Sequence, residues 1–169
     1  MTTALLVVDV QQALVDALAP DRRAQFLGTL SDLIERARAC AAPVVYIRHA
    51  DEELVSGTPP WHIAAEIAPE PGEIVVEKTF RDSFRETALQ DTLATLGVEG
   101  LVVCGMQTEY CVDATVREAE RRGYRVTLVE DAHATYPDGD ASEEQIRTQM
   151  HRVAQGIARI VPAAEVFAR

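Results

Sequence analysis

The sequence alternates short apolar runs with longer segments of helical period, and this alternation constrains the fold more than any other feature. The apolar runs predict six strands, at residues 4–8, 43–48, 73–78, 101–105, 124–131 and 158–166. Strands that alternate with helices form a parallel sheet covered by helices on both faces. We therefore expect an α/β fold, a three-layer α/β/α arrangement around a six-stranded, mainly parallel, Rossmann-like sheet.

The segments between the strands predict the helices. Residues 12–40 are helical in pattern, with a break before Pro20, because proline disfavours α geometry in the residue that precedes it. Further helices should end near residue 97 and span about 108–122 and 142–156. Residues 50–72 hold four of the eight prolines and predict a long loop with one short helix near 63–67. Three residue pairs offer capping boxes at helix starts: Ser83 with Glu86, Thr87 with Gln90, and Ser142 with Gln145.

Composition narrows the class of partner. The 169 residues suit a single domain over 1–169, and the net charge of −11 disfavours nucleic acid and anionic membranes as partners. No apolar run approaches the roughly 20 residues of a membrane span, and the first residues lack the features of a signal peptide. Three irregularly spaced cysteines do not make a disulfide framework. We expect a cytoplasmic protein whose partner is a small molecule.

Three residues able to do chemistry lie at the carboxyl ends of predicted strands. Asp9 follows the first strand, Lys78 ends the third and is the only lysine, and Cys111 lies one turn into the helix after the fourth. Right-handed crossovers bring these ends to one edge of the sheet, where ligands of such folds bind. Each residue alone also has a simpler explanation: an Asp caps a loop, a lysine is solvated, and a free cysteine packs as a small apolar side chain. Packing accounts well for Cys104, inside a strand, and tolerably for Cys40, at a helix end.

Packing accounts less well for Cys111, because its segment begins a helix at the ligand edge. With Thr108 as N-cap, Cys111 would occupy the N3 position, where unpaired backbone N–H groups favour a thiolate. Asp9 can accept the thiol proton and the Lys78 ammonium can stabilise the anion. The three residues together suit acyl transfer.

Longer stretches of the chain resemble a known family. These stretches are LLVVDVQ, VVYIRH, GTPPWHIAAEIAPEPGEIVVEKTFRDSF, LVVCGMQTEYCVDATVREAERRGY and VTLVEDAHAT. They resemble the isochorismatase-like cysteine hydrolases, a family that includes nicotinamidases and N-carbamoyl amidohydrolases. The most specific element is G-x-x-T-x-x-C-V followed by T-x-R-x-A, joined to an N-terminal strand ending in D-x-Q. The resemblance implies the isochorismatase-like hydrolase fold and a homodimer or homotetramer.

The resemblance also implies roles for particular residues. The family's catalytic triad maps onto Asp9, Lys78 and Cys111. A cis peptide bond is implied between Met106 and Gln107. It would turn the N–H of Gln107 inward, so that Gln107 and Cys111 supply the oxyanion hole.

Metal binding is the point at which this chain departs from the family's nicotinamidases. Those enzymes bind a metal through an Asp-x-His pair and further histidines, whereas this chain has the reverse order, His49-x-Asp51, followed by His62. Single histidines more often belong to loops or surfaces than to metal sites. We expect no metal and no other cofactor.

These features predict a hydrolase that cleaves a small amide or carbamoyl C–N bond through a thioester on the cysteine. The aspartate would be general base and acid, and the lysine its electrostatic support. For the substrate pocket we consider Gln11, Trp61, Phe80 and Tyr110, although Trp61 and Phe80 suit core or subunit packing equally well.

Three alternatives use other chemistry. An isochorismatase-type vinyl-ether hydrolase needs acid catalysis by the aspartate but no nucleophilic thiol. A non-catalytic thiol sensor would use a cysteine of low pKa. Aspartyl-phosphate chemistry is disfavoured, because Gln11 stands where a second carboxylate would hold Mg²⁺ and no glycine-rich phosphate loop follows the strand.

Overall fold

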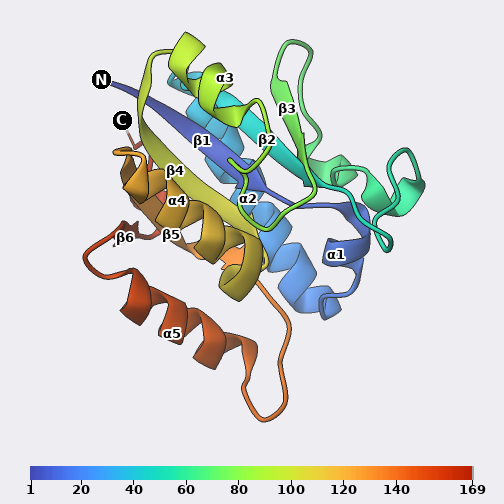
Figure 1. Cartoon of the computed structure of the whole chain (residues 1–169). Helices are drawn as coiled ribbons and strands as arrows, with labels where there is room; N and C mark the ends of the chain where they lie inside the picture. Colours follow the sequence, from blue (N-terminus) through green and yellow to red (C-terminus); the bar gives the residue numbers. More distant parts are fainter. Residues whose placement is uncertain (169) are drawn as a thin grey trace.

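A computed structural model describes residues 1–168, and over these residues the fold is built on a six-stranded sheet. The strands lie in the order β3-β2-β1-β4-β5-β6, and each neighbouring pair is parallel (Figure 1). Their bounds are Thr2–Val8 (β1), Val44–His49 (β2), Ile74–Lys78 (β3), Val98–Met106 (β4), Arg125–Ala134 (β5) and Arg159–Val161 (β6). The expected α/β class and six-stranded sheet are confirmed.

Five α-helices of the described chain connect and cover these strands. They are α1 (Gln12–Asp16), α2 (Pro20–Ala39), α3 (Leu89–Thr95), α4 (Asp113–Arg121) and α5 (Glu143–Ala154). The break before Pro20 is confirmed, as is the capping box of Ser142 with Gln145 at the start of α5. Three short 3₁₀ turns lie at Pro59–Trp61, Ala65–Ile67 and Ala163–Glu165, and a π-helical turn, Thr108–Val112, precedes α4.

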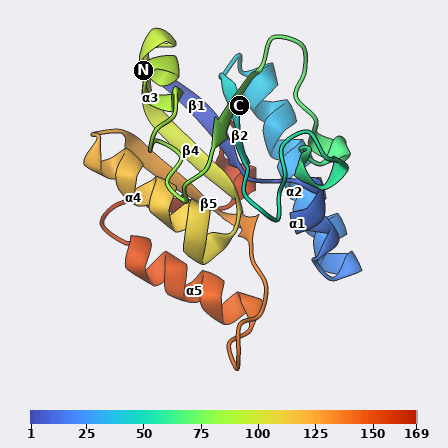
Figure 2. The same ribbon diagram turned by 45° about the vertical axis from the view of Figure 1, so that its right-hand side comes forward.

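Alternate side chains of β1 point to opposite faces of the sheet and meet different helices. Leu5 and Val7 pack in one core with the apolar face of α2. Leu6 and Val8 pack in a second core with α3, α4 and α5. Figures 1 and 2 show the helices on the two sides of the sheet, which is the expected three-layer arrangement.

The start of α3 differs from the prediction. This helix begins only at Leu89, and neither Ser83 with Glu86 nor Thr87 with Gln90 forms a capping box. The hydroxyl of Ser83 instead shares a buried hydrogen bond of 2.8 Å with Thr115 of α4, and Glu86 has a positive φ of 53° that a helix cannot include. The sixth strand is also shorter than predicted and ends at Val161, before Pro162.

The strand order reverses between β1 and β4, and such a reversal opens a crevice at the carboxyl ends of the strands. Gly105, near the end of β4, fits the close approach of β1 at this point. Its φ is 121°, and a Cβ atom there would overlap the carbonyl oxygen of Val8. Chain segments that leave β1 and β4 therefore start side by side.

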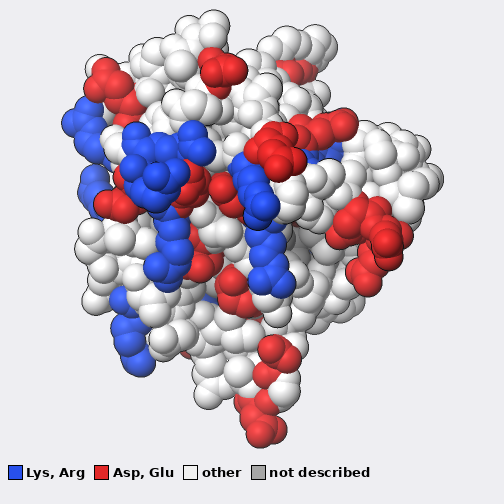
Figure 3. All heavy atoms as spheres, viewed as in Figure 1, with Lys and Arg blue, Asp and Glu red and all other residues white. Residues whose placement is uncertain are grey.

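Charged side chains of both signs lie beside one another on the face shown in Figure 3. At the end of α4, for example, Arg121 and Arg122 both pair with Glu118. Carboxylates compensate these arginines, so they do not add to an open basic patch. None of the helices in residues 1–168 is both long and apolar enough to span a bilayer.

Candidate active site

The structure brings the three predicted side chains together at the carboxyl edge of the sheet. Asp9 follows β1, Lys78 is the last residue of β3, and Cys111 lies in the π-helical turn after β4. The Nζ atom of Lys78 is 2.7 Å from Oδ2 of Asp9 and 3.4 Å from Sγ of Cys111. Residues up to 102 positions apart in sequence thus meet at one point, as the parallel topology predicts.

Lys78 is buried and lies at the centre of the site. Besides Asp9 and Cys111, its Nζ atom contacts Nδ1 of His49 at 2.9 Å and the carbonyl oxygen of Phe80 at 3.0 Å. Its side chain is fully buried, with 0% of its surface exposed. A buried ammonium needs a full set of acceptors, and these contacts provide them.

Asp9 is buried and has one oxygen without a partner. Oδ2 accepts from Lys78, whereas Oδ1 has no hydrogen-bond partner among the described residues. Burial raises the pKa of Asp9, and Lys78 opposes this by favouring the carboxylate. The backbone of Asp9 has a φ of 50°, a conformation that Asp tolerates better than most side chains. The free Oδ1 is therefore available to accept a proton.

Cys111 differs from the prediction in its local geometry and protonation. Gln107, not Thr108, is the N-cap, and the hydroxyl of Thr108 bonds to the ring of His133 at 2.8 Å instead of capping the helix. The pKa of the Cys111 thiol is raised to about 12, mainly by burial and also by the charge of Asp9, whereas Lys78 acts to lower it. The expectation of a thiolate favoured by the helix terminus is therefore wrong for the resting site.

The segment before Cys111 contains a cis peptide bond between Met106 and Gln107, at the position that the resemblance implies. The N–H of Gln107 donates to no other group in residues 1–168, and Gln107 lines the same hollow as Cys111. This N–H is free to bind an oxygen atom of a ligand.

A hollow of about 400 Å³ lies over Cys111. Its lining includes Asp9, Gln107 and Cys111. The other lining residues are Ala13, Leu14, Ala17, His49, Asp51, Glu53, Leu54, Arg81, Tyr110 and Tyr136. The guanidinium of Arg81 stacks on the ring of Tyr110, 4.5 Å from its centroid. A hollow of this size can hold a small molecule against the thiol.

Three of the four residues predicted for the pocket do not line this hollow. Gln11 is fully buried, and its amide donates to the carbonyl oxygens of His49 and Trp61. It therefore stabilises the backbone of these segments and does not face the hollow. Trp61 is buried under the guanidinium of Arg48. The ring of Phe80 packs under Arg85. Tyr110 alone of the four lines the hollow.

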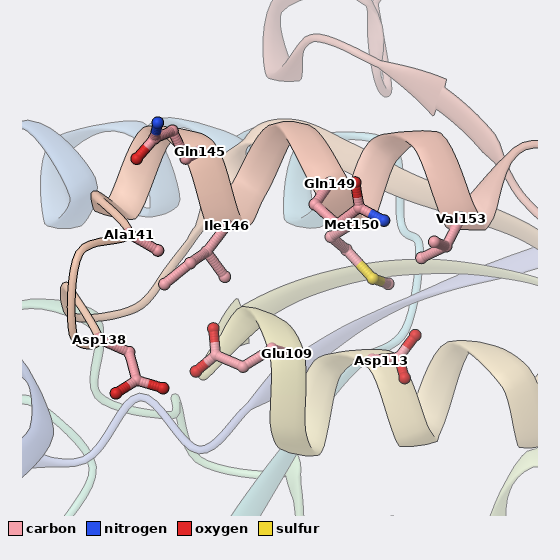
Figure 4. A pocket seen from close by; sticks show the side chains of 9 residues that line it. All are labelled: Glu109, Asp113, Asp138, Ala141, Gln145, Ile146, Gln149, Met150 and Val153. Carbon is pink, nitrogen blue, oxygen red and sulfur yellow. The ribbon is translucent and has the colours of Figure 1, made fainter.

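A second hollow, of about 380 Å³, lies between α5 and the start of α4 (Figure 4). Glu109 and Asp113, which flank Cys111 in sequence, line it together with Ile146, Met150 and Val153 of α5. It contains none of the three predicted catalytic side chains, so the hollow over Cys111 is the candidate active site.

Known proteins are similar to this chain in sequence and in fold. The sequence model of the Isochorismatase domain matches residues 3–165, which is nearly the whole chain. The chain belongs to the isochorismatase family. A streptothricin hydrolase of Streptomyces noursei is 46% identical over 138 residues, which are 79% of this chain and 54% of that protein. A second streptothricin hydrolase of the same organism is matched over 50% of its length, so this family member spans about half the length of these curated relatives.

Solved structures of the isochorismatase family have the same fold. An isochorismatase of Pseudomonas putida KT2440 superposes with a TM-score of 0.89 at 30% identity, over 97% of this chain and 89% of that one. An N-carbamoylsarcosine amidase of Thermoplasma acidophilum superposes with a TM-score of 0.83 at 28% identity, over 98% of this chain and 99% of that one.

A metal site like that of the family's nicotinamidases does not fit the residues of this family member. Both ring nitrogens of His49 have partners, Lys78 at 2.9 Å and Asp51 at 3.0 Å, which leaves the ring no lone pair for a metal. His62 is exposed and lies against the ring of Trp61. Within the described residues, no three His, Cys, Asp or Glu side chains are grouped so as to hold a metal ion.

The contact of His49 with Lys78 is the part of the site that sequence reasoning missed. The two residues are 29 positions apart, and His49 was considered only as a metal ligand. The available signal was the register of the two strands, since His49 and Lys78 end neighbouring strands that pair in parallel.

Proposed function

We propose that the protein is an amidohydrolase that cleaves a small amide or carbamoyl C–N bond through a thioester on Cys111. The observation that carries the proposal is the free, buried Oδ1 of Asp9 beside a thiol that burial keeps protonated. A thiol of this kind needs a base at the moment of attack. Asp9 lines the hollow beside Cys111 and interacts with its side chain, so we assign this role to Asp9. The relatives that carry the names hydrolase and amidase support this class of reaction.

In the first half-reaction, Asp9 takes the proton of Cys111 and the thiolate attacks the carbonyl carbon of the substrate. The carbonyl oxygen becomes an oxyanion that the N–H groups of Gln107 and Cys111 bind. Asp9 then gives the proton to the leaving nitrogen, the C–N bond breaks, and an acyl thioester remains on Cys111.

In the second half-reaction, Asp9 removes a proton from a water molecule, and the resulting hydroxide attacks the thioester carbon. The C–S bond breaks, the acid product leaves, and Asp9 returns the proton to the sulfur of Cys111. The Lys78 ammonium stabilises the carboxylate and the thiolate in turn.

The test is the loss of hydrolysis in Cys111→Ala. Small amides, ureido acids and carbamoyl compounds would be screened for ammonia release, and the best substrate would be followed with the variant. We expect kcat/KM to fall by at least about 1,000-fold, the size of effect seen when a nucleophile is removed. Intact-mass measurement of wild type after an acid quench should show the acyl adduct on Cys111.

Cys40→Ser is the matched control, because Cys40 is exposed and lies between α2 and the amino end of β2, at the sheet edge opposite the site. It should keep full activity. A Cys111→Ala variant with wild-type activity would contradict the proposal and would favour vinyl-ether hydrolysis, which needs only the acid Asp9. The raised pKa of Cys111 already disfavours a thiol sensor, which relies on a low pKa.

A further inference from the structure

His49 lies beside Lys78 because of the register of two strands. β2 and β3 pair in parallel with His49 directly opposite Lys78, so the two side chains project from the same face of the sheet. Nδ1 of His49 is 2.9 Å from Nζ of Lys78, and 15% of the His49 side chain is exposed, toward the hollow over Cys111.

The partners of His49 fix its tautomer. An ammonium only donates hydrogen bonds, so Nδ1 accepts from Lys78 and the ring proton resides on Nε2. Nε2 donates to Oδ2 of Asp51 at 3.0 Å. The other oxygen of Asp51 accepts from the N–H groups of Leu54 and Glu53, and these bonds, that of Leu54 foremost, hold the pKa of Asp51 below its usual value. Asp51 is thus a fixed anion that orients the ring.

Lys78 has three N–H groups and four acceptors around it. The shortest contacts are with Asp9 at 2.7 Å, His49 at 2.9 Å and Phe80 at 3.0 Å, and Sγ of Cys111 is the most distant at 3.4 Å. Three N–H groups cannot serve four acceptors singly, so the acceptors compete for them. The hydrogen bond from Lys78 to Sγ of Cys111 is therefore shared with another acceptor.

We propose that His49, oriented by Asp51, is a positioning residue that withholds one N–H group of Lys78 from Cys111 and so keeps the resting thiol protonated. The inference rests on the proposed function, in which Cys111 is the nucleophile and Asp9 takes its proton. Its consequence is that the thiolate forms when a substrate is in place, and not in the open hollow.

The test measures the alkylation of Cys111 by iodoacetamide at pH 7.5, followed by intact mass in a Cys40→Ser background. Two variants differ in whether they keep the acceptor. The amide oxygen of His49→Asn lies near the position of Nδ1 and can accept from Lys78, whereas the amide of His49→Gln lies near Nε2 and faces Asp51. We expect alkylation to be about tenfold faster in His49→Gln, the effect of one hydrogen bond to a charged group, and within about twofold of wild type in His49→Asn.

A double-mutant cycle with Lys78→Met separates this effect from easier access to the sulfur. If the effect passes through Lys78, His49→Gln should change the alkylation rate by less than about twofold in the Lys78→Met background. Equal acceleration in both backgrounds, an unchanged or slower rate in His49→Gln, or equal acceleration in His49→Asn would each overturn the proposal. Alkylation needs no amide substrate, so this result is independent of the ammonia-release test of the proposed function.

Discussion

At the scale of single residues, the site places a thiol, a carboxylate and an ammonium in one buried cluster while keeping the thiol protonated. The two charges neutralise each other across 2.7 Å, and burial holds the pKa of Cys111 at about 12. Asp9 has two opposite effects on the cysteine. Its charge disfavours the thiolate, and in the proposed mechanism its free oxygen is the base that produces the thiolate.

Asp9→Asn should separate these two effects. Removing the charge lowers the pKa of Cys111, so more thiolate is present at any pH below about 12 and alkylation by iodoacetamide becomes faster. Removing the base stops proton transfer, so hydrolysis falls by about 100-fold to 10,000-fold. Both rates would be measured between pH 6.5 and 9 on the same preparation.

Asp113→Asn is the control for this prediction. Asp113 is only two residues from Cys111, but it faces the second hollow and pairs with Arg117 at 2.9 Å. It should leave both rates unchanged. Slower alkylation in Asp9→Asn would mean that loss of the base outweighs loss of the charge, and it would contradict the predicted gain in thiolate.

That Asp9, Lys78 and Cys111 lie together could be predicted from sequence, because each one ends or follows a strand and parallel topology brings strand ends together. The pocket residues could not be predicted in this way. Whether Gln11, Trp61 or Phe80 faces the hollow depends on side-chain direction in loops, which follow no period. Gln11 points inward and donates to backbone carbonyl groups, and the rings of Trp61 and Phe80 pack under arginine side chains.

At the scale of elements, the ends of β1 and β4 carry the site, and their close contact depends on one glycine. Helix starts were harder to predict than strands, because a capping pair in sequence competes with other partners. Ser142 caps α5, which is exposed at that end. The hydroxyl of Ser83 instead shares a buried hydrogen bond with Thr115. Strands were easier to predict, because a short apolar run fits few structures other than a buried strand.

Gly105→Ala should destabilise the fold at this contact. A Cβ atom would overlap the backbone of Val8, and a φ of 121° is unfavourable for alanine. We expect a loss of at least about 2 kcal/mol in the free energy of unfolding, measured by urea titration with circular dichroism. Cys111 lies six residues away, so its alkylation should also change.

Gly28→Ala is the same substitution at another glycine, and it should raise the free energy of unfolding instead of lowering it. Gly28 is exposed within α2, and an added Cβ would meet no atom within 4 Å. Alanine in an exposed helix interior is favoured over glycine by about 0.5 to 1 kcal/mol. A Gly105→Ala protein as stable as wild type would show that β1 and β4 have room to separate.

At the scale of the whole molecule, a buried histidine links the layers on both sides of the sheet. His133 of β5 bonds to Thr108 beside the active site at 2.8 Å and to His151 of α5 at 2.9 Å. Its carbonyl oxygen accepts from Arg22 of α2, which also pairs with Glu143 at the start of α5. Burial, aided by the nearby His151, Arg147 and Arg22, lowers the pKa of His133 well below its usual value.

This histidine should make the fold sensitive to acid. The unfolded chain takes up a proton on His133 near pH 6.5, whereas the folded chain does not until the pH is well below that. The unfolded state therefore binds more protons in that range, and stability is lost as the pH falls below about 6.5. The expected slope from this one group is up to about 1.4 kcal/mol per pH unit.

His133→Asn isolates this contribution from that of the carboxylates. The variant should be less stable than wild type at pH 8, because it loses buried contacts, but the gap between the two free energies of unfolding should narrow as the pH is lowered from 7 to 5.5. Urea titrations at each pH measure the gap. For His62→Asn, at an exposed position outside this network, the difference in free energy of unfolding from wild type should stay constant over this pH range. A gap for His133→Asn that stays constant over this range would mean that His133 is protonated alike in the folded and unfolded chains, and that the buried link between the layers carries no acid sensitivity.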